Sequence, residues 1–144
     1  MQTVLSGASY LLMIGALVTL YLTRSLFSLH PMVIAPQLAA IALMMWARLT
    51  FGRRSFHVTA APTEGGLVTT GPYRYIRHPI YAAVCLFVSA GALAHPSLIA
   101  GACATLVIGG SIIRLLAEER LLARRYSEYG AYAASTKRMV PYVF

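Results

Sequence analysis

The stretch HPIYAAVCLFVSAGALAHPSLIAGACATLVIGGSII, residues 78–113, decides the fold, because its 36 consecutive residues include no Lys, Arg, Asp or Glu. A helix needs about 20 mostly apolar residues to cross a bilayer, so this stretch has room for two such helices. Pro96 lacks a backbone N–H and disfavours helix at the residue before it, which places a break there. The stretch therefore predicts a helical hairpin with arms at about 79–94 and 97–117.

Two further stretches, 1–23 and 25–47, also lack charged residues and predict spans at about 4–22 and 32–50. The 144 residues are 58% hydrophobic and 11% charged, whereas a soluble domain carries about 25% charge. This composition also excludes a disordered chain. The first span has no basic segment before it and no small-residue cleavage site, so we interpret it as a helix and not as a secretory signal. The sequence predicts an all-α integral membrane protein with four transmembrane helices in a single domain, 1–144.

The net charge of +8, from twelve basic and four acidic residues, would suggest a nucleic-acid partner in a soluble protein. The positions of the basic residues favour a membrane topology instead. If the second and fourth spans end in the cytoplasm, eleven of the twelve lie on that side and only Arg24 lies on the other. The eleven are Arg48, Arg53, Arg54, Arg74, Arg77, Arg114, Arg120, Arg124, Arg125, Lys137 and Arg138. We expect a multi-pass protein whose active site faces the cytoplasm, with membrane lipids and no nucleic acid as partners.

The segment 52–78 between the second and third spans is polar. It contains turn signals at Gly65-Gly66 and Gly71-Pro72, with Leu67-Val68-Thr69 as a short extended piece between them. Its backbone N–H and C=O groups are not used in a helix, so they are available to a polar ligand. We interpret it as a cytosolic loop that binds a polar ligand, with a plain solvated loop as the alternative.

The motif Arg77-His78-Pro79-Ile80-Tyr81 begins the third span, with Pro79 at the first helical position and His78 at the cap. Free N–H groups and the positive end of the helix dipole make such a helix start a site for an anion. We expect His78 and Arg77 to strengthen it for a carboxylate or a phosphate. The alternative is that His78 only caps the helix and Arg77 meets lipid headgroups.

The end of the fourth span carries Arg114 and the pair Glu118-Glu119, in a chain with only four acidic residues. Arg114 and Glu118 are four residues apart and therefore lie on one helix face. An ion pair at the membrane surface is one explanation. The other is that the glutamates bind a cation or hydroxyl groups while Arg114 holds an anionic group of a substrate.

The residues after this span predict an amphipathic interfacial helix over about 118–134. We place its Tyr126 and Tyr129 at the level of the lipid headgroups. The basic and aromatic tail, 137–144, is expected to lie on the same surface.

No residues have the spacing of a metal site, so none is predicted. Cys85 and Cys103 are interpreted as packed, reduced thiols. His30, His57 and His95 have no acid, Cys or second His at ligand spacing and receive no role.

Taken in order, the motifs resemble one family. Leu67-Val68-Thr69-Thr70-Gly71-Pro72-Tyr73 precedes Arg77-His78-Pro79-Ile80-Tyr81, then Glu118-Glu119 at the end of a span, then Leu122, Tyr129, Tyr132 and Pro141. Over about 51–141 this order resembles the isoprenylcysteine carboxyl methyltransferases, within a wider group that includes the phospholipid N-methyltransferases. RHP alone is a weak signal, whereas the blocks in this order are specific.

The resemblance implies an S-adenosylmethionine-dependent methyltransferase that holds its cofactor between the loop and the last two spans. It implies cofactor contacts at Gly65, Gly66, Leu67, Val68, Tyr73, His78, Pro79, Ile80, Tyr81, Glu118 and Glu119, and a substrate-facing, catalytic Arg114. Gly65 and Gly66 stand where the family often has a His or another polar residue, so only backbone contacts are expected there.

The chemistry of this cofactor agrees with the residues. Its carboxylate suits the helix start at His78, its ammonium and ribose hydroxyls suit Glu118 or Glu119, and its sulfonium suits the rings of Tyr73 or Tyr81. Glu118 is also a catalytic candidate beside Arg114, because an amine acceptor would need a group to take its proton. Arg48 either joins Arg114 in binding the substrate or extends to the headgroups.

We expect carboxyl methylation of a lipophilic, isoprenylcysteine-like acceptor, because Arg114 can orient a carboxylate and a carboxylate needs no base. Methylation of a phospholipid amine, with Glu118, Glu119 or His78 passing the proton, or of a small thiol or other lipophile, is the alternative. From another class, a non-catalytic membrane transporter or assembly subunit is the alternative, although the spans carry no mid-depth charge for a conduction path.

Overall fold

The computed structural model describes residues 2–52 and 66–144, with side chains described from residue 7 onward in these ranges. Within them the chain forms helices and no named strand, which confirms the all-α prediction. The elements are α1 (Gln2–Leu22), α2 (Pro31–Phe51), the 3-10 turn η2 (Gly71–Arg74), α3 (Pro79–Ala94), α4 (Leu98–Arg125) and α5 (Tyr129–Ser135). The bounds of α1, α2 and α3 agree closely with the spans expected from the uncharged stretches.

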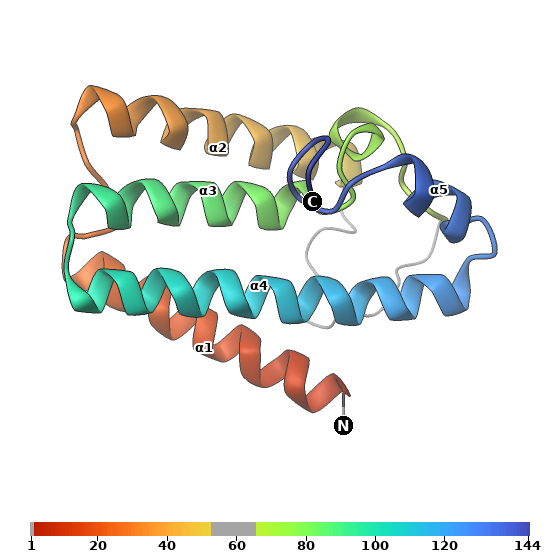
Figure 1. Ribbon diagram of the computed structural model, residues 1–144, viewed down its shortest axis with the longest axis horizontal. Coiled ribbons are helices and arrows are strands. Elements are labelled where there is room, and N and C mark those ends of the chain that lie inside the picture. Colours follow the sequence, from red (N-terminus) through yellow and green to blue (C-terminus); the bar gives the residue numbers. More distant parts are fainter. Residues whose placement is uncertain (1, 53–65) are drawn as a thin grey trace.

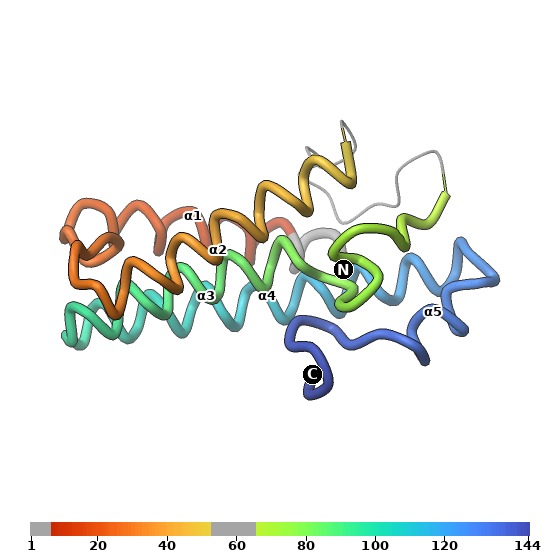
Figure 2. Tube along the Cα trace, turned by 90° about the horizontal axis from the view of Figure 1, so that it is seen from above, coloured from red at the N-terminus to blue at the C-terminus, as the bar shows by residue number. Residues whose placement is uncertain are grey.

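The four long helices lie side by side as a bundle (Figure 1). α1 packs on α4, α2 packs on α3, and α3 joins the two pairs by packing on α4. The connections 23–30 and 95–97 lie at one end, and the start of α3, the end of α2, α5 and the C-terminus lie toward the other (Figures 1 and 2). The functional residues expected from the sequence are thereby gathered at one end of the bundle.

Helix ends follow the local sequence signals. Pro31 and Pro79 each stand in the first turn of a helix, where the missing proline N–H costs no hydrogen bond. The His30 side chain accepts a hydrogen bond from the Met32 N–H, and the Ser97 side chain accepts one from the Ala100 N–H. The hairpin break at Pro96 therefore lies where the sequence predicts it, directly before the Ser97 cap of α4.

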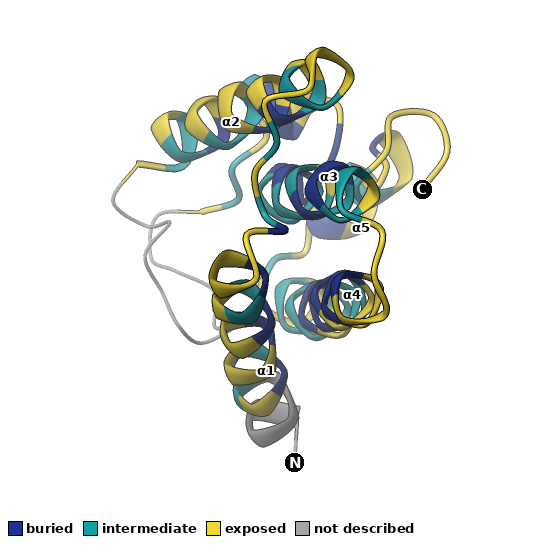
Figure 3. Ribbon diagram, turned by 90° about the vertical axis from the view of Figure 1, so that its left-hand side faces the viewer, coloured by how far each residue is buried: buried dark blue, intermediate teal, exposed yellow. Residues whose placement is uncertain are grey.

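α1 and α2 each present an exposed face (Figure 3), and large apolar side chains lie on these faces. Leu11, Leu12, Leu22, Leu38 and Leu49 are all more than half exposed. Exposed apolar surface of this extent marks an interaction with lipid or with protein. By length and composition α2 and α4 are able to cross a membrane, and shorter apolar helices cover Gly7–Leu22 and Pro79–Ala94. Membrane association follows, and crossing by all four helices remains a prediction.

α1 approaches α4 at backbone level. A Cβ atom at Gly110 of α4 would stand 2.6 Å from Met13 Cγ and 3.4 Å from the Ser9 carbonyl oxygen of α1. Only glycine permits this approach. The core between α1, α3 and α4 is apolar and consists of Met13, Ala16, Leu20, Val88, Ala100, Cys103, Ala104 and Val107.

The expected interfacial helix over about 118–134 is wrong in its bounds. α4 continues without a break to Arg125, because the residues after its apolar run are strong helix formers such as Leu, Ala, Glu and Arg. The chain then turns at 126–128 and forms the short α5. Tyr129 is buried within the protein, so its expected place at the headgroup level is also wrong.

Candidate functional site

The start of α3 meets the far end of α4 around His78. The His78 side chain is buried and lies between two carboxylates. Its Nδ1 is 3.7 Å from Glu118 Oε2, and its Nε2 is 3.3 Å from Glu119 Oε1. The ring makes no capping hydrogen bond to α3. The two motifs that the sequence analysis singled out, 77–81 and 114–119, are therefore in direct contact.

One turn into α3, Tyr81 links the two other polar residues of α4. Its hydroxyl donates to Glu118 Oε1 at 2.6 Å and accepts from Arg114 Nε at 3.0 Å. Arg114 Nη2 lies 4.0 Å from the same glutamate oxygen, so the i,i+4 ion pair is present. Only 4% of Arg114 is exposed, whereas the Glu118 side chain keeps 26% exposure. Glu118 is thus the acid of this cluster that a ligand can reach.

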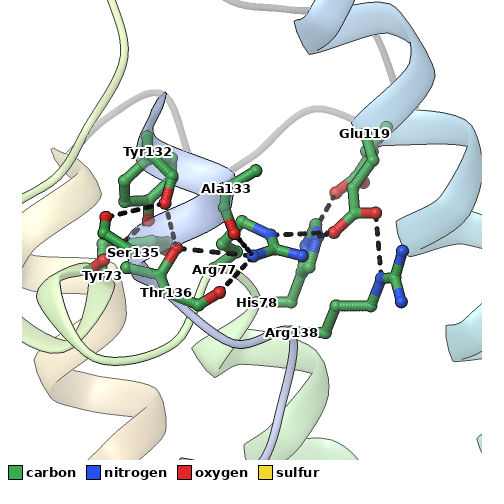
Figure 4. Close-up of polar contacts among 10 residues, drawn as sticks. Tyr73, Arg77, His78, Glu119, Tyr132, Ala133, Ser135, Thr136 and Arg138 are labelled. Carbon is green, nitrogen blue, oxygen red and sulfur yellow. Dashed lines mark hydrogen bonds and ion pairs between the residues drawn. The ribbon is translucent and has the colours of Figure 1, made fainter. Parts of the chain in front are cut away.

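Glu119 is the anionic centre of a separate network (Figure 4). Arg77 Nε donates to its Oε1 and Arg138 Nε donates to its Oε2, each at 3.0 Å. Burial alone would raise the pKa of Glu119, but the hydrogen bonds from His78, Arg138 and Arg77 outweigh it and lower the pKa to about 2. Glu119 lies beyond the apolar run of α4 and stays ionised at neutral pH. Both of its carboxylate oxygens accept hydrogen bonds from arginine side chains of the protein.

Arg77 has a different role from the one expected. Its Nη1 donates to the Ala133 carbonyl at 2.8 Å and to the Thr136 carbonyl, while its Nε is held by Glu119. The side chain therefore points into the protein, toward the end of α5, as Figure 4 shows. It connects three segments and does not extend to lipid headgroups or to an anion at the start of α3.

The residues after α5 run beside the RHP motif and form what we call the C-terminal strap, residues 136–138. The N–H of Arg77 donates to the Lys137 carbonyl at 2.7 Å, and the N–H of His78 donates to the Arg138 carbonyl at 2.8 Å. Ile76 and Lys137 form an isolated parallel bridge. The strap thus fixes the backbone at His78 and carries Arg138 to Glu119.

The predicted loop residues are placed in part. Gly65 lies outside the described residues. Gly66 has a φ of +84°, which suits glycine, and Leu67 and Val68 are half-buried without regular secondary structure. Pro79 is buried and Ile80 is half-buried in the first turn of α3. Pro79 and Ile80 thus lie beside His78, and no direct contact of Gly66, Leu67 or Val68 with the polar cluster is found among the described residues.

Tyr73 of η2 is buried beside the cluster. Its ring lies 5.5 Å from that of Phe51, and its carbonyl accepts from the Tyr132 hydroxyl at 2.7 Å. Burial, then the Tyr132 hydroxyl and the Glu118 charge, raise the pKa of Tyr73, while the Arg48 charge opposes them. Tyr73 therefore lies within electrostatic range of both Glu118 and Arg48, which places these predicted residues around one region.

Sequence reasoning missed four contributors to this region. Arg138 and Thr136 lie in the strap, Tyr132 lies in α5, and Tyr10 of α1 stacks on Arg114. Tyr129 adds a buried hydroxyl that has no hydrogen-bond partner among the described residues. The charges around it are those of Glu119, Arg77 and Arg138, so it belongs to the network of Glu119.

The described parts of the chain contain no group of three His, Cys, Asp or Glu residues that could hold a metal ion. His30 caps α2, and His95 Nε2 lies 2.9 Å from the Phe27 carbonyl, so both have structural roles. His57 is outside the described ranges.

Comparison with known proteins gives two matches. A family model described as phospholipid methyltransferase matches residues 31–129, which run from the start of α2 to the first residue of α5. The nickel-cobalt-cadmium resistance protein NccN of Alcaligenes xylosoxydans xylosoxydans is 39% identical over 80 residues, covering 52% of this chain and 36% of that protein. The match thus spans little more than a third of the length of this relative. No solved structure matches the chain.

Proposed function

Because the chain belongs to the phospholipid methyltransferase family, we propose that it uses S-adenosylmethionine to methylate the carboxylate of a lipophilic, isoprenylcysteine-like acceptor at the cytosolic face of a membrane. Family membership supports methyl transfer to a lipophilic substrate. The observation that carries the finer proposal is the contact of His78 and Tyr81 with Glu118, next to the buried Arg114. This contact brings together the start of α3, which we propose as an anion site, the partly exposed Glu118 carboxylate and the Arg114 guanidinium.

The donor set fits S-adenosylmethionine. Glu118, with 26% of its side chain exposed, would bind the ammonium or the ribose hydroxyls. His78 does not cap the first turn of α3 with its side chain, so the N–H groups of Ile80 and Tyr81 would bind the carboxylate. The rings of Tyr73 and Tyr81 would face the sulfonium.

The remaining predicted contacts at Gly65, Gly66, Leu67, Val68, Pro79 and Ile80 are proposed through their backbone or apolar atoms. Glu119 is proposed to support the cofactor site indirectly, because its oxygens are already held by Arg77, Arg138 and His78.

A carboxylate acceptor agrees with how the bases of the site are engaged. When bound, S-adenosylmethionine supplies a methyl group whose transfer to a carboxylate oxygen leaves the electron pair of the broken C–S bond on sulfur and releases no proton. In the part of the chain that the structure describes, Glu118 accepts from Tyr81, and both ring nitrogens of His78 face carboxylates. Both side chains are thus held in place by their neighbours, while part of Glu118 stays exposed to a ligand. A carboxylate acceptor, aligned by Arg114, would need neither of them as a base.

The apolar part of the acceptor has a place between the helices. A pocket of about 220 Å³ lies between α1, α2 and α3 and has an almost wholly apolar lining that includes Leu17, Met44, Val84 and Phe87. On α3, Phe87 lies six residues past Tyr81, or about 9 Å along the axis. The pocket is thus at the depth at which a chain attached to a head group at Tyr81 and Arg114 would lie, and we propose entry from the bilayer.

Amine methylation of a phospholipid is the second candidate, favoured by the description of the matching family model. It requires a base, for which the partly exposed Glu118 is the candidate. The two candidates differ in their product, since a methyl ester is cleaved by mild alkali and an N-methyl group is not.

We would incubate the purified protein in lipid nanodiscs with methyl-labelled S-adenosylmethionine and a total membrane lipid extract. The proposal expects labelled lipid that releases methanol in alkali, with at least about a tenfold loss in Glu118→Gln and little loss in the exposed Glu128→Gln control. Alkali-stable label would favour the amine candidate. No transfer, together with no binding of S-adenosylhomocysteine, would refute both.

A further inference from the structure

The first helix completes the site from outside the family match. Tyr10 of α1 is half-buried, and the Arg114 guanidinium carbon lies 4.8 Å from the centroid of its ring. This is within the range of a cation–π interaction, which is stronger when the cation is removed from water. Arg114 is only 4% exposed, so the stack is desolvated.

Three helices together define the plane of the guanidinium. Tyr10 of α1 covers a face, Tyr81 of α3 accepts from Nε at 3.0 Å, and Glu118 of α4 lies 4.0 Å from Nη2. The side chain of an arginine has several rotatable bonds, so contacts of this kind determine which way its donors point. Removing the Tyr10 ring would remove this contact from one face of the Arg114 guanidinium.

Tyr10 lies on the part of α1 that packs on α4. The carbonyl oxygen of its neighbour Ser9 and the Met13 side chain both lie near Gly110 of α4. Leu17, seven residues later on α1, lines the apolar pocket, and seven residues of helix span about 10 Å. α1 therefore presents an aromatic ring at the level of Arg114 and an apolar side chain at the level of the pocket.

We infer that Tyr10 is a positioning residue for Arg114 and thereby sets the affinity of the site for the anionic head group of the acceptor. This inference rests on the proposed function. The family match begins at residue 31, so it covers neither Tyr10 nor the rest of α1. The acceptor side of the site is thus assembled partly from a segment that the family pattern does not include.

The test compares Tyr10→Leu, Tyr10→Phe and the control Tyr21→Leu, whose residue is 64% exposed on the same helix. The full-length protein in nanodiscs is assayed with N-acetyl-S-farnesylcysteine, an anionic prenyl amphiphile. Tyr10→Leu should raise the KM for this acceptor about three- to thirtyfold while the KM for S-adenosylmethionine changes less than about twofold. Tyr10→Phe keeps the ring face and should stay near wild type. Equal KM values for Tyr10→Leu and Tyr21→Leu, or an equal rise for both substrates, would overturn the inference.

A second measurement does not depend on turnover. In a double-mutant cycle of Tyr10→Leu with Arg114→Gln, the thermal midpoints should be non-additive by about 2–8 °C, because each single change removes the same contact. Additive midpoints would contradict the inference. If the wild type methylates no lipid acceptor, the proposed function fails and this cycle alone decides the role of Tyr10.

Discussion

Replacing Arg77 with Met should release the C-terminal strap from its contacts while leaving the ligand-facing residues in place. The substitution removes the 3.0 Å bond to Glu119 and the bonds to the carbonyls of Ala133 and Thr136. A net hydrogen bond contributes about 1 kcal/mol, and a bond to a charged group about 1.5–3 kcal/mol. Breaking a buried ion pair costs about 3–5 kcal/mol.

Glu119 keeps two partners, Arg138 and His78, so the cost should lie near the lower end of that range. About 3 kcal/mol corresponds to a fall of about 6–12 °C in the thermal midpoint for a chain of this size. Arg77→Lys should recover little of it, because a compact ammonium cannot bind the carboxylate and two carbonyls as the planar guanidinium does.

Thermal unfolding in detergent measures the midpoint, and limited trypsin digestion at Lys137 measures release of the strap. Arg74→Met is the matched control, because Arg74 is exposed and lies only three residues away. Arg77→Met and Arg74→Met could instead have the same thermal midpoint, with weaker binding of S-adenosylhomocysteine in Arg77→Met. In that case Arg77 does not hold the C-terminal strap and acts on the ligand, as the sequence first suggested.

Three further predictions concern acid stability, helix packing and the pocket. The pKa of Glu119 is lowered from its ordinary value of 4.5 to about 2, so the stability that it contributes is present above pH 4.5 and is lost as the pH falls toward 2. The thermal midpoint of the wild type should therefore fall over this pH range. Glu119→Gln should abolish this fall, whereas Glu128→Gln should keep it. Gly110→Leu should lower the midpoint by forcing α1 from α4, whereas Gly109→Leu, at a position with open space, should not. Val84→Phe should reduce turnover of long-chain acceptors at least about tenfold and spare short-chain ones, since excluding two methylene groups costs about 1.6 kcal/mol.

The helices were predictable because their signals are local. Uncharged runs, a proline in the first turn and a proline after His95 each act within a few residues, and α3 matches its predicted bounds of 79–94. The end of α4 was missed because the apolar run stops well before the helix does. Charged residues with high helix propensity continue α4 to Arg125, and the backbone becomes extended at Tyr126.

Half of the site was predictable for the same reason. Arg114 and Glu118 share a helix face by spacing, and His78 and Pro79 mark a helix start. The partners that come from distant segments carry no such signal. Arg138 and Arg77 approach Glu119 from 19 and 42 residues away. Nothing near Arg138 distinguishes it from a basic residue at a headgroup surface, and the motif of Arg77 indicated an anion at the helix start and not Glu119.

The adjacent glutamates explain how one short stretch of α4 serves both structure and ligand. Consecutive residues of a helix point about 100° apart, so Glu118 and Glu119 face different neighbours. Glu119 meets two arginines and is tied into the strap, whereas Glu118 meets a tyrosine hydroxyl and keeps a quarter of its side chain exposed. His78 contacts both. His78 therefore stands between the carboxylate that a ligand can reach and the carboxylate that holds the strap.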